Sequence, residues 1–137
     1  MHAIGRVVSP LTDLSAAPRQ PDEGAPGAWL AFDARLADAL VGVRVGDALL
    51  VLTWLDRARR DVLQVHPRGD LSRPLTGVFA TRAPDRPNPI GVHRVEVVAI
   101  DTPTEGGPRV AVRALEALDG TPILDVKPLL GSTIAER

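Results

Sequence analysis

The sequence predicts a mostly β protein: a single small β-barrel of about seven strands, with one short helix and long rim loops. Its 137 residues suit one domain with one hydrophobic core. Short runs of β-forming residues alternate apolar and polar side chains, and turn residues separate these runs. Helical spacing is confined to one short stretch near residues 34–40. Residues 1–130 are assigned to the barrel and residues 131–137 to a C-terminal tail.

The expected elements follow the chain in order. A long loop at residues 11–27, rich in proline and glycine, follows the first strand. The short helix is expected to begin after Asp33 as its N-cap and to end at Gly42. An Asp119-Gly120 turn precedes the last strand. Strands are expected at residues 3–8, 29–33, 45–55, 61–66, 77–82, 92–100, 109–117 and 122–126.

Residues 82–91, R-A-P-D-R-P-N-P-I-G, are predicted to form a stiff irregular loop between two strands. Each of its three prolines fixes its own φ and favours extended backbone before it, which excludes a helix or a central strand. A stiff loop holds its polar groups at low entropic cost. Asn88 in this loop is the only asparagine of the chain, and Lys127 is its only lysine. The polar side chains of the loop are Arg82, Asp85, Arg86 and Asn88.

Composition excludes several classes of site. The chain has no cysteine, so it has neither disulfides nor thiolate metal ligands. Its three histidines are far apart and show no metal-ligand spacing, so no metal is expected. Neither a secretory signal nor an apolar run of membrane-spanning length is found, which makes a cytoplasmic location the expectation. Rossmann, P-loop and G-x-S-x-G signatures are also missing.

Positive charge is concentrated in the middle of the sequence. The formal net charge is −1, but residues 57–94 hold eight arginines and three acids, a local balance of +5. This distribution favours one positive face. The alternative is that these arginines pair with acids on neighbouring strands. Polar clusters at strand ends, with no cysteine or tyrosine nucleophile, suit binding and orientation of a polar ligand better than covalent catalysis.

Two strings give the sequence a family resemblance. G-V-F-A-T-R-A-P-D-R-P-N-P-I-G at residues 77–91 and L-D-G-T-P-I-L-D-V-K-P at residues 118–128 closely resemble the TrmO family, also called the TsaA-like family. The opening I-G-R-V-V-S-P and a later P-R-Q fit the same pattern. The resemblance implies a β-barrel methyltransferase that uses S-adenosylmethionine, acts as a homodimer and methylates N6 of threonylcarbamoyl-adenosine next to the anticodon of tRNA.

The resemblance also implies the site residues. Those expected to contact the cofactor are Pro18, Arg19, Gln20, Asp56, Arg57, Arg82, Arg86, Val92, Leu118, Asp119, Gly120 and Thr121. Asn88, Asp125 and Lys127 are expected to complete the catalytic site. Asp125 is the candidate general base, although an aspartate in such a position more often orients an arginine or a lysine.

Two departures from the family keep other functions open. Longer members carry an additional C-terminal domain, and Leu129 stands where the family often has an aromatic residue. With no tyrosine in the chain, stacking of a flipped base is expected to use Trp29, Trp54, an arginine plane or an aromatic side chain of another subunit. The alternatives are a methyltransferase for a small metabolite and a non-catalytic barrel that senses S-adenosylmethionine or a nucleoside.

Overall fold

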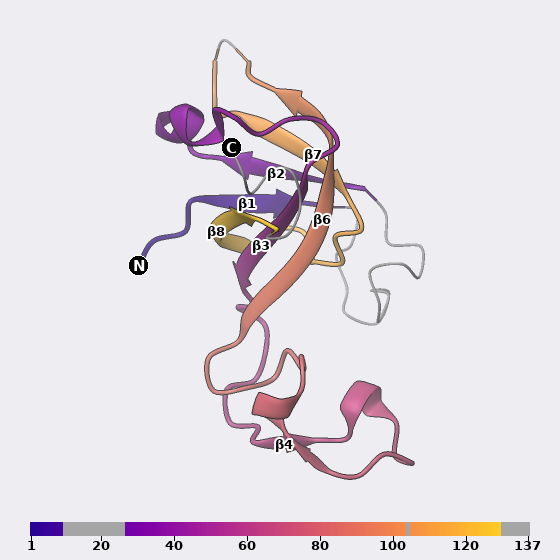
Figure 1. Ribbon diagram of the computed structural model, residues 1–137. Coiled ribbons are helices and arrows are strands. Elements are labelled where there is room, and N and C mark those ends of the chain that lie inside the picture. The colour runs from indigo at the N-terminus through magenta and orange to yellow at the C-terminus, as the bar shows by residue number, and fades with distance from the viewer. Residues whose placement is uncertain (10–26, 104, 130–137) are drawn as a thin grey trace.

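Six antiparallel strands close into a barrel in the computed structural model, which describes residues 1–9, 27–103 and 105–129 (Figure 1). Their order around the barrel is β1-β2-β7-β6-β3-β8, and β8 returns to pair with β1. This ring confirms the predicted mostly β fold class. The barrel strands are β1 Gly5–Val8, β2 Ala28–Phe32, β3 Ala48–Trp54, β6 Ile90–Asp101, β7 Arg109–Arg113 and β8 Pro122–Pro128.

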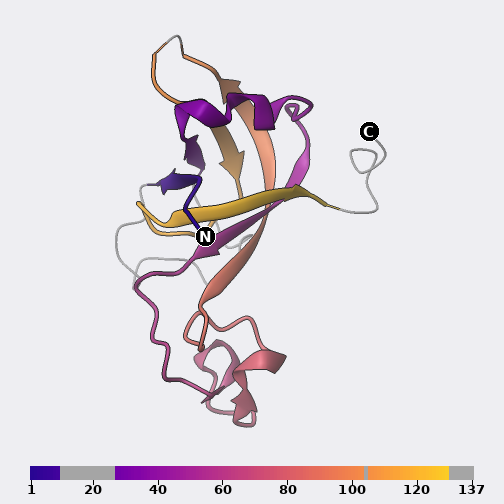
Figure 2. The ribbon, with the colours of Figure 1, turned by 90° about the vertical axis from the view of Figure 1, so that its left-hand side faces the viewer.

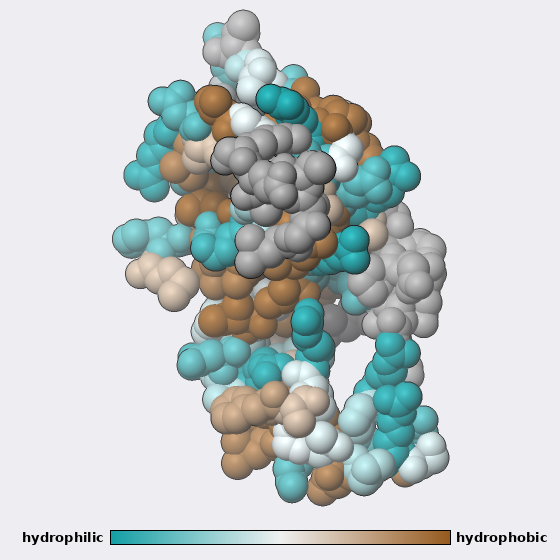
Figure 3. All heavy atoms as spheres, in the orientation of Figure 1, coloured by the Kyte–Doolittle hydropathy of each residue, from teal (hydrophilic) through white to brown (hydrophobic). Residues whose placement is uncertain are grey.

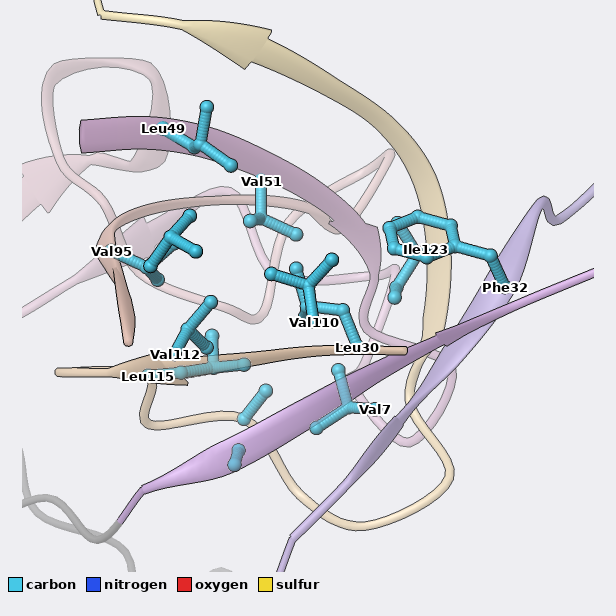
Figure 4. Close-up of a cluster of buried hydrophobic side chains, with 13 residues drawn as sticks. Val7, Leu30, Phe32, Leu49, Val51, Val95, Val110, Val112, Leu115 and Ile123 are labelled. Carbon is cyan, nitrogen blue, oxygen red and sulfur yellow. The ribbon is translucent and has the colours of Figure 1, made fainter. Parts of the chain in front are cut away.

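The barrel interior is filled by apolar side chains, nearly all of them aliphatic, as Figure 4 shows. Inward and outward residues alternate along each strand, which is the pattern a half-buried strand requires. In β3, Leu49, Val51 and Thr53 face inward and are 2%, 0% and 0% exposed. Leu50, Leu52 and Trp54 therefore lie on the outer face. The same alternation places Gly91, His93, Val95 and Val97 of β6 on the inner side.

The predicted helix forms at Ala34–Leu40 as η2, but it is a 3-10 helix (Figure 2). Figures 1 and 2 both place it across the end of the barrel farthest from β4. Asp33 occupies the N-cap position as expected, but its side chain makes no cap hydrogen bond and lies 3.6 Å from Arg35 Nη2. Gly42 follows at φ +98°, a conformation that glycine adopts without strain, so the expected stop is confirmed.

The segment between β3 and β6, residues 55–89, projects from the opposite end of the barrel and is called the arm (Figures 1 and 2). It contains a two-stranded sheet, β4 Gln64–Val65 with β5 Thr76–Gly77. It also contains two 3-10 turns, η3 Pro67–Gly69 and η4 Val78–Ala80.

Two strand predictions in the arm are wrong in extent. Residues 61–66 form only β4, and residues 77–82 turn into η4 after β5. The physical reason is that β4 and β5 offer each other only a short partner. Pro67 begins η3 two residues after Val65 ends β4, so β5 can pair with only two residues. Backbone groups beyond the short ladder bond locally instead, as Thr81 N–H does to the Val78 carbonyl oxygen at 3.0 Å.

Each barrel strand departs from its predicted bounds by a few residues, and for β7 and β6 the structure shows the cause or the consequence. β7 ends at Arg113 instead of residue 117, because Ala114 has a φ of +68° that breaks the extended backbone. β6 begins at Ile90, so Gly91 lies inside the strand opposite Thr53. A Cβ at Gly91 would lie 2.5 Å from Thr53 Oγ1 and 2.8 Å from His93 Nε2. Glycine is therefore required by close packing at this point.

His93 provides a test of this packing. Its Nε2 lies 2.8 Å from Thr53 Oγ1, and burial lowers the pKa of His93 from 6.5 to about 4. Because the folded-state pKa lies below the unfolded one, the unfolded state binds more protons between these values. Stability should therefore fall as the pH drops from about 6.5 towards about 4, by up to roughly 3 kcal/mol from this group. Urea titrations at several pH values measure that loss.

His93→Gln removes the titrating ring while keeping an amide that can bond Thr53. Its free energy of unfolding should change less between pH 7 and pH 4.5 than that of the original chain. His2→Gln is the control, because His2 is exposed near the N-terminus. An unchanged pH dependence in His93→Gln would contradict this account.

Candidate functional site

Three adjacent strands, β8, β3 and β6, present the candidate site residues on the outer face of the barrel. Strand register places Asp125, Leu52 and Val92 in one row across the three strands. The next row along the strands is Lys127, Leu50 and Arg94. Directly opposed residues share a face and contact one another. Two residues expected to be catalytic and one expected to bind the cofactor therefore lie on one surface, which we call the outer strip.

The outer strip is apolar in its middle and charged at its edges. Val92 is 39% exposed, and Leu50 and Leu52 are half-buried. On the β8 edge, Lys127 Nζ lies 3.2 Å from Asp125 Oδ2. Both side chains are more than half exposed, so this pair adds little stability and leaves each group accessible. The Asp125 carboxylate therefore lies beside a lysine and remains open to solvent.

The loop at residues 82–91 is held against the start of the arm by a group of hydrogen bonds. Arg59 N–H donates to Asp85 Oδ1 at 2.8 Å, and Arg86 N–H donates to the Arg59 carbonyl oxygen at 3.0 Å. Leu55 N–H donates to the Pro89 carbonyl oxygen at 2.8 Å. These bonds bring Arg86 and Asn88 alongside Asp56 and Arg57, which follow β3 directly.

Arg60, which the sequence analysis did not single out, fastens this loop. Its Nε donates to the Pro87 carbonyl oxygen at 2.7 Å, and its Nη2 donates to Asn88 Oδ1 at 2.8 Å. Its guanidinium also lies over the Trp54 ring, 5.4 Å from the centroid. A planar group with several donors is needed for all three contacts at once. The only sequence signal is its position, because Arg60 follows the Asp56-Arg57 pair by three residues in a chain with a single lysine and a single asparagine.

The other loop arginines differ in their contacts. Arg86 Nη1 donates to the carbonyl oxygens of Thr81 and Ala83 at 3.0 and 3.1 Å, so it supports the loop directly. Arg82 is exposed and makes no hydrogen bond or ion pair with the described part of the chain. The Arg94 side chain is also exposed, and it makes no hydrogen bond or ion pair with residues 1–9, 27–103 and 105–129. These two side chains are available to an anionic ligand.

Within residues 57–94, Arg59 and Arg73 pair with acids of the same segment. Arg59 bonds Asp61 at 3.0 Å, and this bond lowers the pKa of the Asp61 carboxyl. Arg73 lies 3.8 Å from Asp70, whose pKa is lowered mainly by a hydrogen bond from Ser72. Arg60 and Arg86 donate to neutral oxygens and so keep their charge uncompensated by these contacts. The contacts of Arg60 and Arg86 are those expected of a positive face.

The turn at residues 118–121 is fixed to the edge of β1. Gly120 N–H donates to the Val7 carbonyl oxygen at 2.7 Å, and Thr121 Oγ1 donates to the Leu118 carbonyl oxygen at 2.7 Å. Asp119 accepts a bond from Ser9 N–H at 3.0 Å and remains exposed. Gly120 has a φ of +82°, as expected for this turn.

The turn and the arm meet the outer strip at one end of the barrel. Residues 118–121 lead into β8, where Ile123 lies opposite Thr53 of β3. Thr53 in turn lies opposite Gly91 at the start of β6. Three segments with candidate residues therefore converge by strand register. Pro18, Arg19 and Gln20 lie outside the described residues.

A groove of about 470 Å³ lies at the other end of the barrel, between η2 and β8. Phe32, Leu36 and Leu40 make it largely apolar, and Asp125 and Lys127 are its charged lining residues. Neither Val92 nor the turn at residues 118–121 reaches it. We therefore assign the candidate site to the outer strip.

Arg60→Lys tests whether the guanidinium fastens the loop. The variant keeps the charge but loses the double donation to Pro87 and Asn88 and the planar contact with Trp54. The Leu55 amide, which bonds the Pro89 carbonyl, should then exchange with solvent about tenfold faster. Hydrogen exchange measured by NMR gives this rate. Arg59→Lys is the matched control, because the Arg59 side chain bonds Asp61. Equal exchange in both variants would contradict the assignment.

Within the described residues, no cluster of histidine, aspartate and glutamate could hold a metal ion. Residues 1–9, 27–103 and 105–129 also contain no helix long and apolar enough to cross a membrane.

Comparison with protein families gives a match over most of the chain. A family model described as the tRNA-methyltransferase O N-terminal domain matches residues 6–133. A "Probable S-adenosyl-L-methionine-binding protein" of Methanothermobacter thermautotrophicus is 41% identical over 128 residues, which are 93% of this chain and 88% of that protein. An "S-adenosyl-L-methionine-binding protein" of Archaeoglobus fulgidus is 40% identical over 127 residues, or 93% and 86% of the two chains.

Solved structures and one shorter match extend this similarity. A crystal structure of TrmO has 31% identity and a TM-score of 0.69, and another from Pseudomonas aeruginosa has 29% identity and a TM-score of 0.68. Both alignments cover 100% of this chain but only 62% and 60% of the solved chains. A tRNA (adenine(37)-N6)-methyltransferase of Eikenella corrodens is 52% identical over 54 residues, which are 39% of this chain and 30% of that protein.

Proposed function

Because this chain belongs to the tRNA-methyltransferase O N-terminal domain family, we propose that it N6-methylates threonylcarbamoyl-adenosine next to the anticodon of tRNA. The family match over residues 6–133 supports the more general conclusion that the chain is a methyltransferase dependent on S-adenosylmethionine. The tRNA substrate is the finer part of the proposal, and it would locate the reaction in the cytoplasm.

The residues at the outer strip fit S-adenosylmethionine chemically. Its adenine ring suits an apolar surface, which Leu52, Ile90 and Val92 provide on two adjacent strands. Its carboxylate suits a guanidinium, and that of Arg86, in the loop that leads into β6, bonds neutral carbonyl oxygens and keeps its charge. The exposed Asp119 carboxylate can accept hydrogen bonds from the ribose hydroxyls. We propose that these groups hold the cofactor.

When bound, S-adenosylmethionine supplies a methyl group on a sulfonium, which is transferred by in-line displacement. The protein then has mainly to align the nucleophile and exclude water. We propose that the apolar middle of the outer strip excludes water from the reacting atoms. Asp125, held beside Lys127, is the proposed acceptor of the N–H proton released by the carbamoylated adenine. Asn88 keeps the loop in place through Arg60.

The chain spans about 60% of the solved TrmO chains, which keeps a second substrate class open. A small metabolite would need the outer strip but not the positive arm. Exposed Arg82 and Arg94 favour the nucleic acid, because neither is neutralised by a described residue.

A methyl-transfer assay decides between these substrates. Radiolabelled S-adenosylmethionine is supplied with bulk tRNA or with a small-molecule extract, and label should enter tRNA. If Arg82 and Arg94 contact two phosphates, tRNA affinity should fall roughly tenfold between 50 and 200 mM salt. Label confined to small molecules, with no salt dependence, would establish the metabolite alternative. Cofactor binding without transfer to either pool would establish the sensor.

The same site leads us to propose a homodimer. The outer strip is an open face, so a cofactor lying on it needs a second surface to exclude water. Trp29 and Phe32 do not suit the interface, because Phe32 is 9% exposed in the core and Trp29 is half-buried beneath Arg109. Val92, 39% exposed on the β6 side of the strip, is the better candidate.

Val92→Arg should weaken both the dimer and cofactor binding. Val98→Arg is the matched control, because Val98 is 37% exposed on the same strand but outside the strip. Light scattering across a dilution series, paired with calorimetric titration of S-adenosylhomocysteine, measures both properties. A monomer that binds this ligand at full strength would refute the shared site.

A further inference from the structure

The structure singles out one aromatic side chain. The chain has two tryptophans, two phenylalanines and no tyrosine, and all four rings lie in the described residues. Phe32 is buried in the core, and Arg109 covers Trp29 with its guanidinium carbon 4.8 Å from the ring centroid. Arg60 covers Trp54 in the same way. Phe79 is 83% exposed, so it is the ring that keeps its faces open.

Phe79 is mounted on a rigid part of the arm. Its neighbour Val78 is 2% exposed and donates its N–H to the Leu63 carbonyl oxygen at 2.9 Å. Thr81 closes the turn, because its N–H and Oγ1 both donate to the Val78 carbonyl oxygen at 3.0 Å. Arg86 Nη1 donates a further hydrogen bond to the Thr81 carbonyl oxygen. The ring is thus presented on fixed backbone, which lowers the entropic cost of binding a partner.

The charge beside Phe79 identifies the kind of partner. Arg82 follows three residues later and has no partner in the described chain. Uncovered aromatic faces next to free guanidinium groups are the chemistry that binds unpaired nucleobases and their phosphates. Both tryptophans, by contrast, already carry an arginine on one face.

A protein partner is the competing explanation, because Leu63, Leu71 and Leu75 are also exposed on the arm. In Figure 3 the end of the arm shows hydrophobic spheres beside hydrophilic ones. Charge argues against a second copy here, since two arms would bring arginines of the same sign together. An RNA loop, by contrast, supplies phosphates that the arginines can bind and unpaired bases that can stack on Phe79.

We propose that Phe79 is the ring on which an unpaired base of the RNA substrate stacks. This inference rests on the proposed tRNA function and extends it to a named docking residue. The arm projects away from β8, which carries Asp125 and Lys127, so the stacked base is another base of the RNA and not the reacting adenine (Figure 1). Phe79 therefore positions the RNA and takes no part in the chemistry.

The experiment measures binding of a fluorescently labelled anticodon stem-loop RNA by anisotropy, at saturating S-adenosylhomocysteine. Phe79→Ala and Phe79→Leu should each raise the dissociation constant roughly tenfold, and Phe79→Trp should keep it near the original value. Leu75→Ala is the matched control, because Leu75 is 53% exposed on the same arm, and it should leave binding unchanged. Arg82→Gln should reduce the salt slope by about one unit, whereas Phe79→Ala should not.

Each result bears on the inference. If Phe79→Leu binds RNA as well as the original chain, stacking is refuted. If Phe79→Ala dissociates an oligomer in light scattering, the ring belongs to a protein interface. Calorimetry with S-adenosylhomocysteine should show equal affinity in the Phe79 and Leu75 variants, because these side chains lie outside the cofactor strip. RNA binding by the original chain with no effect of Phe79 overturns this inference alone. No RNA binding by the original chain overturns the proposed tRNA function and the inference with it.

Discussion

Closure of the barrel by β8 is the constraint on which the rest of the structure depends. This last strand pairs with β3 along most of its length and with β1 through only Gly5 and Arg6. The register with β3 sets Asp125 and Lys127 opposite Leu52 and Leu50, and so creates the outer strip. The short pairing with β1 also fixes the preceding turn, whose buried Thr121 bonds the Leu118 carbonyl. One strand therefore fixes both the closed core and the relative positions of the site residues.

The proline-rich loop shows why this chain relies on arginine. Prolines at positions 84, 87 and 89 remove N–H donors while leaving their carbonyl oxygens to be satisfied. Arg60 and Arg86 supply the missing donors, to Pro87, Asn88, Thr81 and Ala83. Because these acceptors are neutral, the guanidinium charges persist at the surface. The same side chains that hold the loop in shape thus give the arm its positive potential.

Local sequence patterns predicted the barrel, the positions of its six strands, and the glycine conformations at Gly42 and Gly120. They failed where a long-range partner decides the outcome: residues 77–82 alternate like a strand, yet β4 offers two residues to pair with. The resemblance named Val92, Asp125 and Lys127, but only register shows that they share one face. Arg60 and Phe79 could not be identified from the sequence. Arg60 matters because it covers the Trp54 ring, and Phe79 matters because its own ring stays exposed, and both facts depend on the folded structure.

The arm is joined to the barrel only where β3 ends and β6 begins, and no barrel strand pairs with residues 61–81 in the described chain. A change of length or sequence in those residues therefore leaves all six barrel registers intact. The surface of the arm can thus vary without refolding the barrel that carries the outer strip. The arm is accordingly a segment that can be exchanged between related proteins while the barrel stays the same.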